Sequence, residues 1–214
     1  MLKTIVFSLV LAVLFIETAK NKSHAASYYY FFEYSPCGIM LSNWITEQEK
    51  YIIVQLHNEL RQKVARGEEQ RGNPGPQPPA LAMPNLVWDE GLAEKAQQSA
   101  NRCEMKHDAC FYNPPYCDYG QNIATIWTKA PMDILRIEDR ILGWYDEVEL
   151  VNNNLVRSYY GESSSGWGHY TQMVWAKSTR IGCGISRYYK YNFNYMMIFC
   201  NYGPAGNIPA QPVY

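Results

Sequence analysis

The pattern of apolar and polar positions over residues 46–67 has the period of an α-helix. Apolar side chains recur there every three or four positions, which places them on one face of a helix. Thr46 and Glu49 have the spacing of a capping box at the start, and Gly67 marks the end. The face expected to turn inward consists of Ile53, Leu56, Leu60 and Val64.

The same period recurs over residues 87–103 and residues 130–151, which predict two further helices. Asp89 is placed to cap the first of these two. Proline and glycine are abundant in residues 71–80, so this segment predicts a loop. The positions expected to face inward are Leu92, Ala96, Ala100 and Cys103 in one helix, and Ile134, Ile137, Ile141, Tyr145 and Val148 in the other.

Towards the C-terminus the pattern changes to short runs of β-branched and aromatic residues, which is typical of β-strands. Helices in the first part of a chain and strands in the last indicate an α+β fold, in which helices cover a sheet. The polar residues 152–165 predict a loop. Four strands are predicted, over residues 120–127, 169–175, 180–186 and 194–203.

The start of the chain has the pattern of a secretory signal peptide. Lys3 precedes an apolar run over residues 5–16, and small residues follow at Ala25 and Ala26. A helix that spans a bilayer needs about 20 apolar residues, so the run predicts cleavage after Ala25 or Ala26 and no transmembrane anchor. The rest of the chain has the size of a single domain. The expected divisions are a signal peptide over residues 1–25, an N-terminal arm over 26–45, the domain over 46–208 and a short C-terminal tail over 209–214.

The composition narrows the classes of function. The formal net charge is −1 at pH 7 and no basic run is present, which argues against nucleic acid as a partner. The 18 tyrosines suit a wet extracellular surface or a binding cleft, and composition alone does not separate the two. Six cysteines after a signal peptide predict three disulfides, and the lack of close CxxC pairs argues against a zinc-binding cysteine cluster.

Four blocks of the sequence form a distinctive set: "HNELR" at residues 57–61, "NLVWDEGLAEKAQQSANRC" at 85–103, "GHYTQMVWAKSTRIGCG" at 168–184 and "MIFCNYGPAGN" at 197–207. In this order they resemble the CAP superfamily of cysteine-rich secretory, antigen 5 and pathogenesis-related proteins. "ARGEEQRGNPGPQPPA", residues 65–80, is similar in particular to the venom antigen 5 proteins of insects. The resemblance covers about residues 46–208 and implies a three-layer α-β-α sandwich.

The resemblance also implies a cleft lined by two histidines and two acidic residues. His107 and His169 match the histidines, and Glu147 matches one acid. The position of the other acid holds Gln121, as in the antigen 5 proteins, and an amide cannot exchange a proton near neutral pH. We therefore expect no catalysis, no required cofactor, and weak reversible binding of zinc or another divalent metal by His107, His169 and Glu147. The alternative, that both histidines are structural groups held by hydrogen bonds, stays open, and such a packed structural role is expected for His57.

The resemblance narrows the disulfide pairing as well. Cys183 and Cys200 lie on two predicted strands joined by a short loop, so strand pairing and the resemblance both favour a bond between them. The antigen 5 proteins imply a bond from the N-terminal arm to the end of the second helix. The cysteine that bonds in those proteins to the counterpart of Cys110 is missing here, and Cys117 follows nearby instead. The expected pairs are Cys37–Cys103, Cys110–Cys117 and Cys183–Cys200.

Two classes of function remain open. The resemblance implies a secreted venom or salivary protein, expected to be a monomer, which binds host proteins and is an allergen by exposure. The alternative is an extracellular carrier of sterols, fatty acids or other small lipids, since CAP relatives include such carriers. A hydrolase, including a metal-dependent one, is the least favoured class. "GESSSG" at residues 161–166 lacks the G-x-S-x-G spacing of a nucleophile elbow, and paired cysteines leave no thiolate.

Overall fold

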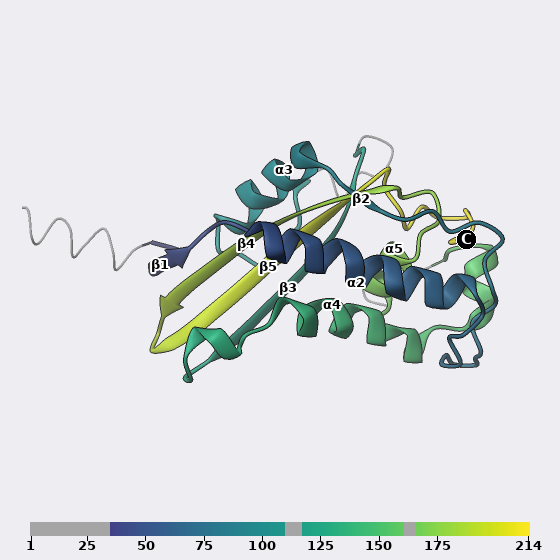
Figure 1. Cartoon of the computed structure of the whole chain (residues 1–214), viewed down its shortest axis with the longest axis horizontal. Coiled ribbons are helices and arrows are strands. Elements are labelled where there is room, and N and C mark those ends of the chain that lie inside the picture. The colour runs from purple at the N-terminus through teal and green to yellow at the C-terminus, as the bar shows by residue number, and fades with distance from the viewer. Residues whose placement is uncertain (1–34, 110–116, 161–165) are drawn as a thin grey trace, which may run out of the picture.

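The computed structural model describes residues 35–109, 117–160 and 166–214 (Figure 1). The expected signal peptide, the first part of the arm and Cys110 lie outside these residues. Of the helices in the described ranges, none has the length and apolar content needed to cross a membrane. The helices are α2 (Glu47–Ala65), α3 (Glu90–Ala100), α4 (Ile137–Asp146) and α5 (Gly168–Met173); the 3-10 helices are η3 (Met132–Ile134), η4 (Glu147–Leu150) and η5 (Asn153–Arg157); and the strands are β1 (Ile39–Ser42), β2 (Val87–Trp88), β3 (Gly120–Thr128), β4 (Arg180–Lys190) and β5 (Phe193–Gly203).

A five-stranded sheet forms the middle of the molecule. β4 and β5 are antiparallel neighbours at its centre, and β3 pairs with the other edge of β5. β1 and β2 both pair with β4, the first antiparallel and the second parallel. In this register Cys183 lies opposite Cys200, and Gln121 lies opposite Asn201. The start of β3 therefore lies beside the end of β5.

Helices cover both faces of the sheet, with α3 on one side and α2, α4 and α5 on the other (Figure 1). The side chains of β5 alternate between the two layers. Ile198 and Cys200 belong to the larger core, which includes residues of α2, α4 and α5, whereas Met197 and Phe199 pack with the alanines of α3. The prediction of an α+β fold arranged as a three-layer α-β-α sandwich is confirmed.

Two glycines of β4 allow α3 to lie close to the sheet. A Cβ atom at Gly182 would overlap backbone atoms of Asp89 and Ala93, and one at Gly184 would overlap the backbone of Gln97. A glycine in a strand interior often marks such a close backbone approach. The glycines in "RIGCGIS" thus set the spacing of one helical layer.

The first helix begins as predicted. The backbone N–H of Glu49 donates to Thr46 Oγ1 at 3.2 Å, and the backbone N–H of Thr46 donates to the Glu49 carboxylate at 2.8 Å. The buried face differs from the apolar pattern, because two polar side chains belong to it. Ile53, His57, Arg61 and Val64 are buried, and Leu56 and Leu60 are partly buried against the same core.

Arg61 shows why a charged residue can occupy this face. Its guanidinium donates five hydrogen bonds of 2.8 to 3.1 Å to backbone carbonyls of segments that follow far along the chain. A buried guanidinium is tolerated only where its donors are satisfied in this way. The four accepting carbonyls are those of Pro84, Met173, Trp175 and Ser178.

Residues 71–80 form a loop, as their composition predicts. A buried acid just before the loop fastens it to the helices, because the side chain of Glu69 is only 1% exposed. Its carboxylate accepts from Lys63 of α2 at 2.8 Å, from the guanidinium of Arg71 at 2.9 and 3.0 Å, and from the hydroxyl of Tyr145 in α4 at 2.8 Å.

The single helix predicted over residues 130–151 is wrong in its extent. The chain forms η3, then adopts extended backbone at Leu135 and Arg136, and only then begins α4, which is followed by η4. Because of this break, Ile134 and Ile137 do not lie on one face of a continuous helix. Ile137 is buried as predicted, while Ile134 is 54% exposed.

The strand predicted over residues 169–175 is also wrong, because this segment forms the short helix α5. Four consecutive residues of α5, from Tyr170 to Met173, are buried. A short run that is buried all round shows no polar face, so periodicity cannot distinguish helix from strand. His169 therefore lies on a helix.

The last residues of the chain pack against the domain. Val213 is buried, its N–H donates to the carbonyl of Val156 at 2.8 Å, and its carbonyl accepts from the N–H of Ala176 at 2.8 Å. Residues 209–214 were expected to form a tail after the domain, and Val213 of this segment belongs to the core.

Two disulfides join the pairs expected from the resemblance. Cys37 bonds to Cys103, which ties the segment before β1 to the end of α3. Cys183 bonds to Cys200 across the central strands. Cys117 is disulfide-bonded as well, and its expected partner lies outside the described residues.

Candidate functional site

The four residues expected to line the site come from four parts of the fold. His107 lies in the loop after α3, Gln121 in β3, Glu147 at the start of η4, and His169 in α5. The structure joins them as two pairs, with His107 Nδ1 3.0 Å from Gln121 Oε1 and His169 Nδ1 2.5 Å from Glu147 Oε1. Asn122, the next residue of β3, donates to the carbonyl of His169 at 3.1 Å and links the pairs. We call these four residues the histidine cluster.

Glu147 caps the helix that carries His169. Its Oε2 accepts from the backbone N–H of His169 at 2.9 Å and from that of Tyr170 at 3.2 Å, while Oε1 receives the imidazole. The first N–H groups of a helix have no partner within it, and a carboxylate there is favoured by the helix dipole. Glu147 therefore fixes α5 and the ring of His169 together.

The contacts of His169 determine which of its nitrogens can accept. A carboxylate can only accept a hydrogen bond, so Nδ1 carries the proton towards Glu147, and in the neutral form of the ring Nε2 is the acceptor nitrogen. The ring stacks on Trp144 with centroids 5.9 Å apart, and the His169 side chain is 32% exposed.

The amide of Gln121 is oriented by groups that cannot exchange roles. Its Nε2 donates to Asp108 Oδ2 at 2.8 Å and to Asn201 Oδ1 at 2.9 Å, and its Oε1 accepts from the backbone N–H of Asp108 at 3.2 Å. The Asn201 amide is itself oriented, since its Nδ2 donates to the carbonyl of Leu92 at 3.2 Å. Gln121 therefore presents oxygen to His107.

This orientation sets the proton position on His107. Because Gln121 Oε1 accepts, His107 Nδ1 donates, and Nε2 is the acceptor nitrogen of the neutral ring. Burial lowers the pKa of His107 and outweighs the hydrogen bond to Gln121, which raises it; smaller electrostatic effects of His169 and Asp108 lower and raise this pKa, respectively. The net effect favours the neutral form of His107.

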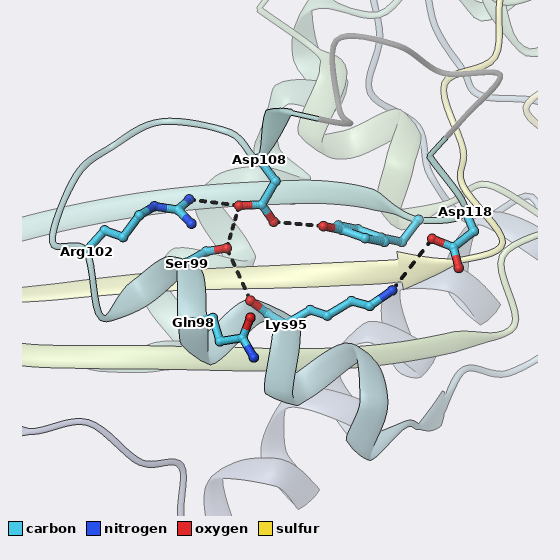
Figure 2. Close-up of a pocket in the computed structure, with 7 residues that line it drawn as sticks. Lys95, Gln98, Ser99, Arg102, Asp108 and Asp118 are labelled. Carbon is cyan, nitrogen blue, oxygen red and sulfur yellow. Dashed lines mark hydrogen bonds and ion pairs between the residues drawn. The ribbon is translucent and has the colours of Figure 1, made fainter.

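Asp108 connects the histidine cluster to a polar pocket on the α3 side of the sheet (Figure 2). Its Oδ1 accepts from Ser99 at 2.6 Å and from Arg102 at 2.8 Å, and its Oδ2 accepts from Tyr119 at 2.9 Å as well as from Gln121. Burial alone would raise the pKa of Asp108, but these hydrogen bonds outweigh it and lower the pKa. The pocket has a volume of about 400 Å³, and Lys95, Gln98 and Asp118 complete its lining.

The expected metal site is not assembled as a set of three ligands. In residues 35–109, 117–160 and 166–214, no three His, Cys, Asp or Glu side chains converge closely enough to hold a metal ion. Glu147 serves His169 as a hydrogen-bond acceptor, which is the usual partner of a metal-binding histidine and not a third ligand.

His57 occupies a structural position, as expected of a packed histidine. It is fully buried, and its ring nitrogens lie 2.7 Å from the carbonyl of Ile53 and 2.9 Å from the hydroxyl of Tyr202. Burial lowers the pKa of His57 to about 4, so the ring is neutral at physiological pH. Tyr202 also accepts from Asn122 at 3.2 Å, which supports the wall of the histidine cluster from within the core.

Sequence reasoning missed Asp108 and Asn201, which orient Gln121. The position of Asp108 directly after His107 in "MKHDAC" was the one available signal. Asn201 offered none, because it reaches Gln121 only through the pairing of β3 with β5.

The α-β-α sandwich is the fold of CAP proteins of known structure. The chain belongs to this family, since the pattern of the cysteine-rich secretory protein family matches residues 54–202.

Within the family the chain is similar to insect venom allergens. It is 45% identical over 181 residues to the Venom allergen 3 homolog of Dinoponera quadriceps, covering 84% of this chain and 78% of that protein. It is 43% identical over 180 residues to Venom allergen 5.02 of Vespa crabro, covering 83% of this chain and 86% of that protein. Among solved structures, NaASP2 with Zn2+ is 30% identical with a TM-score of 0.66, covering 79% of this chain and 86% of that one.

Proposed function

We propose that the chain is a secreted, antigen 5-like protein that acts by binding other molecules and not by catalysis. The observation that carries this proposal is that the one carboxylate of the histidine cluster is committed to structure and that an amide stands in place of a second one. Glu147 accepts three hydrogen bonds that hold α5, and Gln121 is an amide held by four. Acid–base catalysis by a pair of carboxylates needs two groups that can exchange a proton, and the amide of Gln121 cannot do so near neutral pH.

The names of the relatives support venom as the place of action. Relatives named venom allergens align over more than four-fifths of this chain, so the compact fold of the chain is the part that they share. On this proposal the partners are host proteins met outside the cell, the protein works as a monomer, and allergenicity follows from exposure to a stable surface.

The test of this proposal is a panel of peptide and ester substrates incubated with the purified protein, with and without added zinc. We expect no turnover above background. Turnover that disappears in the His107→Ala variant would overturn the proposal, and Glu104→Gln, an exposed residue of the same loop, is the matched control.

Reversible metal binding is a second proposed property, and the tautomers of the two histidines favour it. His107 and His169 each direct Nδ1–H into the protein, so each neutral ring has Nε2 as its donor atom for a metal. A zinc ion would be held by these two nitrogens and water, and it would supply a Lewis-acidic centre when bound. Two ligands predict modest affinity, and a relative of the same fold has a structure with Zn2+.

Calorimetric titration with zinc tests this second property. We expect a measurable heat for the wild type that is lost in His169→Ala and retained in Tyr160→Ala, a variant of an exposed side chain outside the cluster. Equal heats for the wild type and His169→Ala would remove His169 from any metal site.

The lipid-carrier alternative has a direct test of its own. Mass spectrometry of the native secreted protein, before and after delipidation, would report any bound sterol or fatty acid. A lipid present in equimolar amount would replace the proposal of a protein-binding function with that of a carrier.

A further inference from the structure

We propose that Asp108 is the positioning residue of the histidine cluster. It holds the amide of Gln121 in one orientation, and it carries the negative charge that a carboxylate at residue 121 would otherwise place beside His107.

Asp108 and Gln121 are joined by two hydrogen bonds of opposite direction. Gln121 Nε2 donates to Asp108 Oδ2 at 2.8 Å, and the Asp108 backbone N–H donates to Gln121 Oε1 at 3.2 Å. An ionised carboxylate only accepts and a backbone N–H only donates. Rotating the amide by half a turn would therefore lose both bonds and would place like groups in contact.

The surroundings of Gln121 reject an acid. A glutamate in the same conformation would place a carboxylate oxygen where Nε2 now lies, against Asp108 Oδ2 and the amide oxygen of Asn201. Two carboxylates in such contact cannot both ionise. An amide at residue 121 thus fits beside Asp108 and a carboxylate does not. The negative charge lies on Asp108, which is one hydrogen bond away from residue 121.

The charge of Asp108 is balanced away from the histidines. Figure 2 shows Arg102 and Ser99 on one side of its carboxylate and the tyrosine hydroxyl on the other. His107 consequently donates to a neutral amide oxygen, which fixes its Nδ1–H tautomer without placing a negative charge against the ring. Asp108 positions His107 through Gln121, and its charge also acts on the ring directly by raising the pKa of His107.

This inference concerns the same cluster as the proposed function, but it does not require zinc or any other ligand. A failure of zinc binding leaves it standing, and its own failure leaves the zinc titration to be decided separately.

A double-mutant cycle with Asp108→Asn, Gln121→Glu and the double variant tests the inference. Gln121→Glu places two carboxylates in contact, and Asp108→Asn leaves one acceptor oxygen where the carboxylate now accepts from Ser99, Arg102, Tyr119 and Gln121. For each single variant we therefore expect urea unfolding to show a folding equilibrium constant lowered about 10- to 100-fold. The double variant restores a donor facing an acceptor. We expect its folding equilibrium constant to be at least about 10-fold higher than the value predicted by adding the two single effects on the free energy of unfolding. Asp118→Asn is the matched control, because Asp118 lines the same pocket, is largely exposed and has no bond to Gln121.

A spectroscopic readout separates positioning from general stability. In ¹⁵N spectra of the imidazole rings, with the His107 signals assigned by their loss in His107→Ala, we expect Nδ1 protonated in the wild type and in the double variant. An asparagine can turn either its oxygen or its nitrogen towards Gln121, so Asp108→Asn no longer rejects the rotated amide, and we expect a second His107 tautomer to appear beside the first.

Three results would overturn the inference. They are single effects that simply add in the double variant, an unchanged His107 tautomer in folded Asp108→Asn, and, if the single variants do not fold, a double variant that does not fold either.

Discussion

Replacing Glu69 by glutamine should remove a large part of the stability of the protein. The carboxylate is 1% exposed and receives hydrogen bonds from Lys63, Arg71 and Tyr145. Burial alone would raise the pKa of Glu69, but the bonds from Arg71, Lys63 and Tyr145 outweigh it and lower the pKa to about 2 from an ordinary value of 4.5.

The lowered pKa of Glu69 gives the size of the expected loss of stability. At 1.36 kcal/mol for each tenfold change in proton affinity, this lowering corresponds to about 3 kcal/mol of folding free energy at neutral pH. Breaking a buried ion pair by removing one partner costs about 3–5 kcal/mol, which agrees. Because the pKa is lower in the folded state, the contribution is fully present above about pH 4.5 and is lost as the pH falls through about 2.

Urea unfolding of the wild type and Glu69→Gln at pH 7 and at steps down to pH 2.5 measures both effects. We expect the variant to be about 3 kcal/mol less stable at pH 7, with the difference shrinking below pH 4.5. Glu68→Gln is the control, since Glu68 pairs with Arg66 in solvent and its loss should leave the unfolding midpoint unchanged. A difference below about 0.5 kcal/mol at pH 7, or one that does not vary with pH, would refute the reasoning.

Three further predictions rest on packing and can be measured by thermal or urea unfolding. Gly184→Ala should destabilise by about 1–3 kcal/mol because its Cβ overlaps the backbone of α3, whereas Gly143→Ala, where a Cβ meets nothing within 4 Å, should stabilise α4 by about 0.5–1 kcal/mol; equal effects would contradict the close approach of α3. Replacing both Cys183 and Cys200 by alanine should cost about 3 kcal/mol, since the bond closes a loop with a sequence separation of 17; an unchanged midpoint would contradict it. Arg61→Lys should cost about 2–4 kcal/mol, because one ammonium cannot reach all the carbonyls that the guanidinium binds; full stability would show that those carbonyls need no donor.

The elements that sequence reasoning located correctly are those with local signals. The capping box of Thr46 and the N-cap of Asp89 lie within a few residues of the N–H groups that they satisfy. The alternation along β5 places Ile198 and Phe199 on opposite faces of the sheet, and this period can be read directly from the chain.

The features that it missed depend on partners distant along the chain. α5 is capped by Glu147, which is 22 residues away from His169, and no local pattern reports such a cap. Arg61 is buried because it binds carbonyls that come from segments more than 20 residues further on. The histidine cluster was predicted through family resemblance, whereas the tautomers of its histidines follow only from the amide orientation that Asp108 imposes.

The covalent bridge between β4 and β5 has a consequence for how this protein survives digestion. The loop between the two strands is the exposed point of the hairpin, with Tyr191 77% exposed at its tip. A protease that cuts there leaves two ends still joined through Cys183 and Cys200, which are both buried and therefore shielded from soluble thiols. A nicked molecule would run as one chain on a gel without reductant and as two fragments with it. Release of peptides from the central sheet then requires reduction and unfolding as well as cleavage.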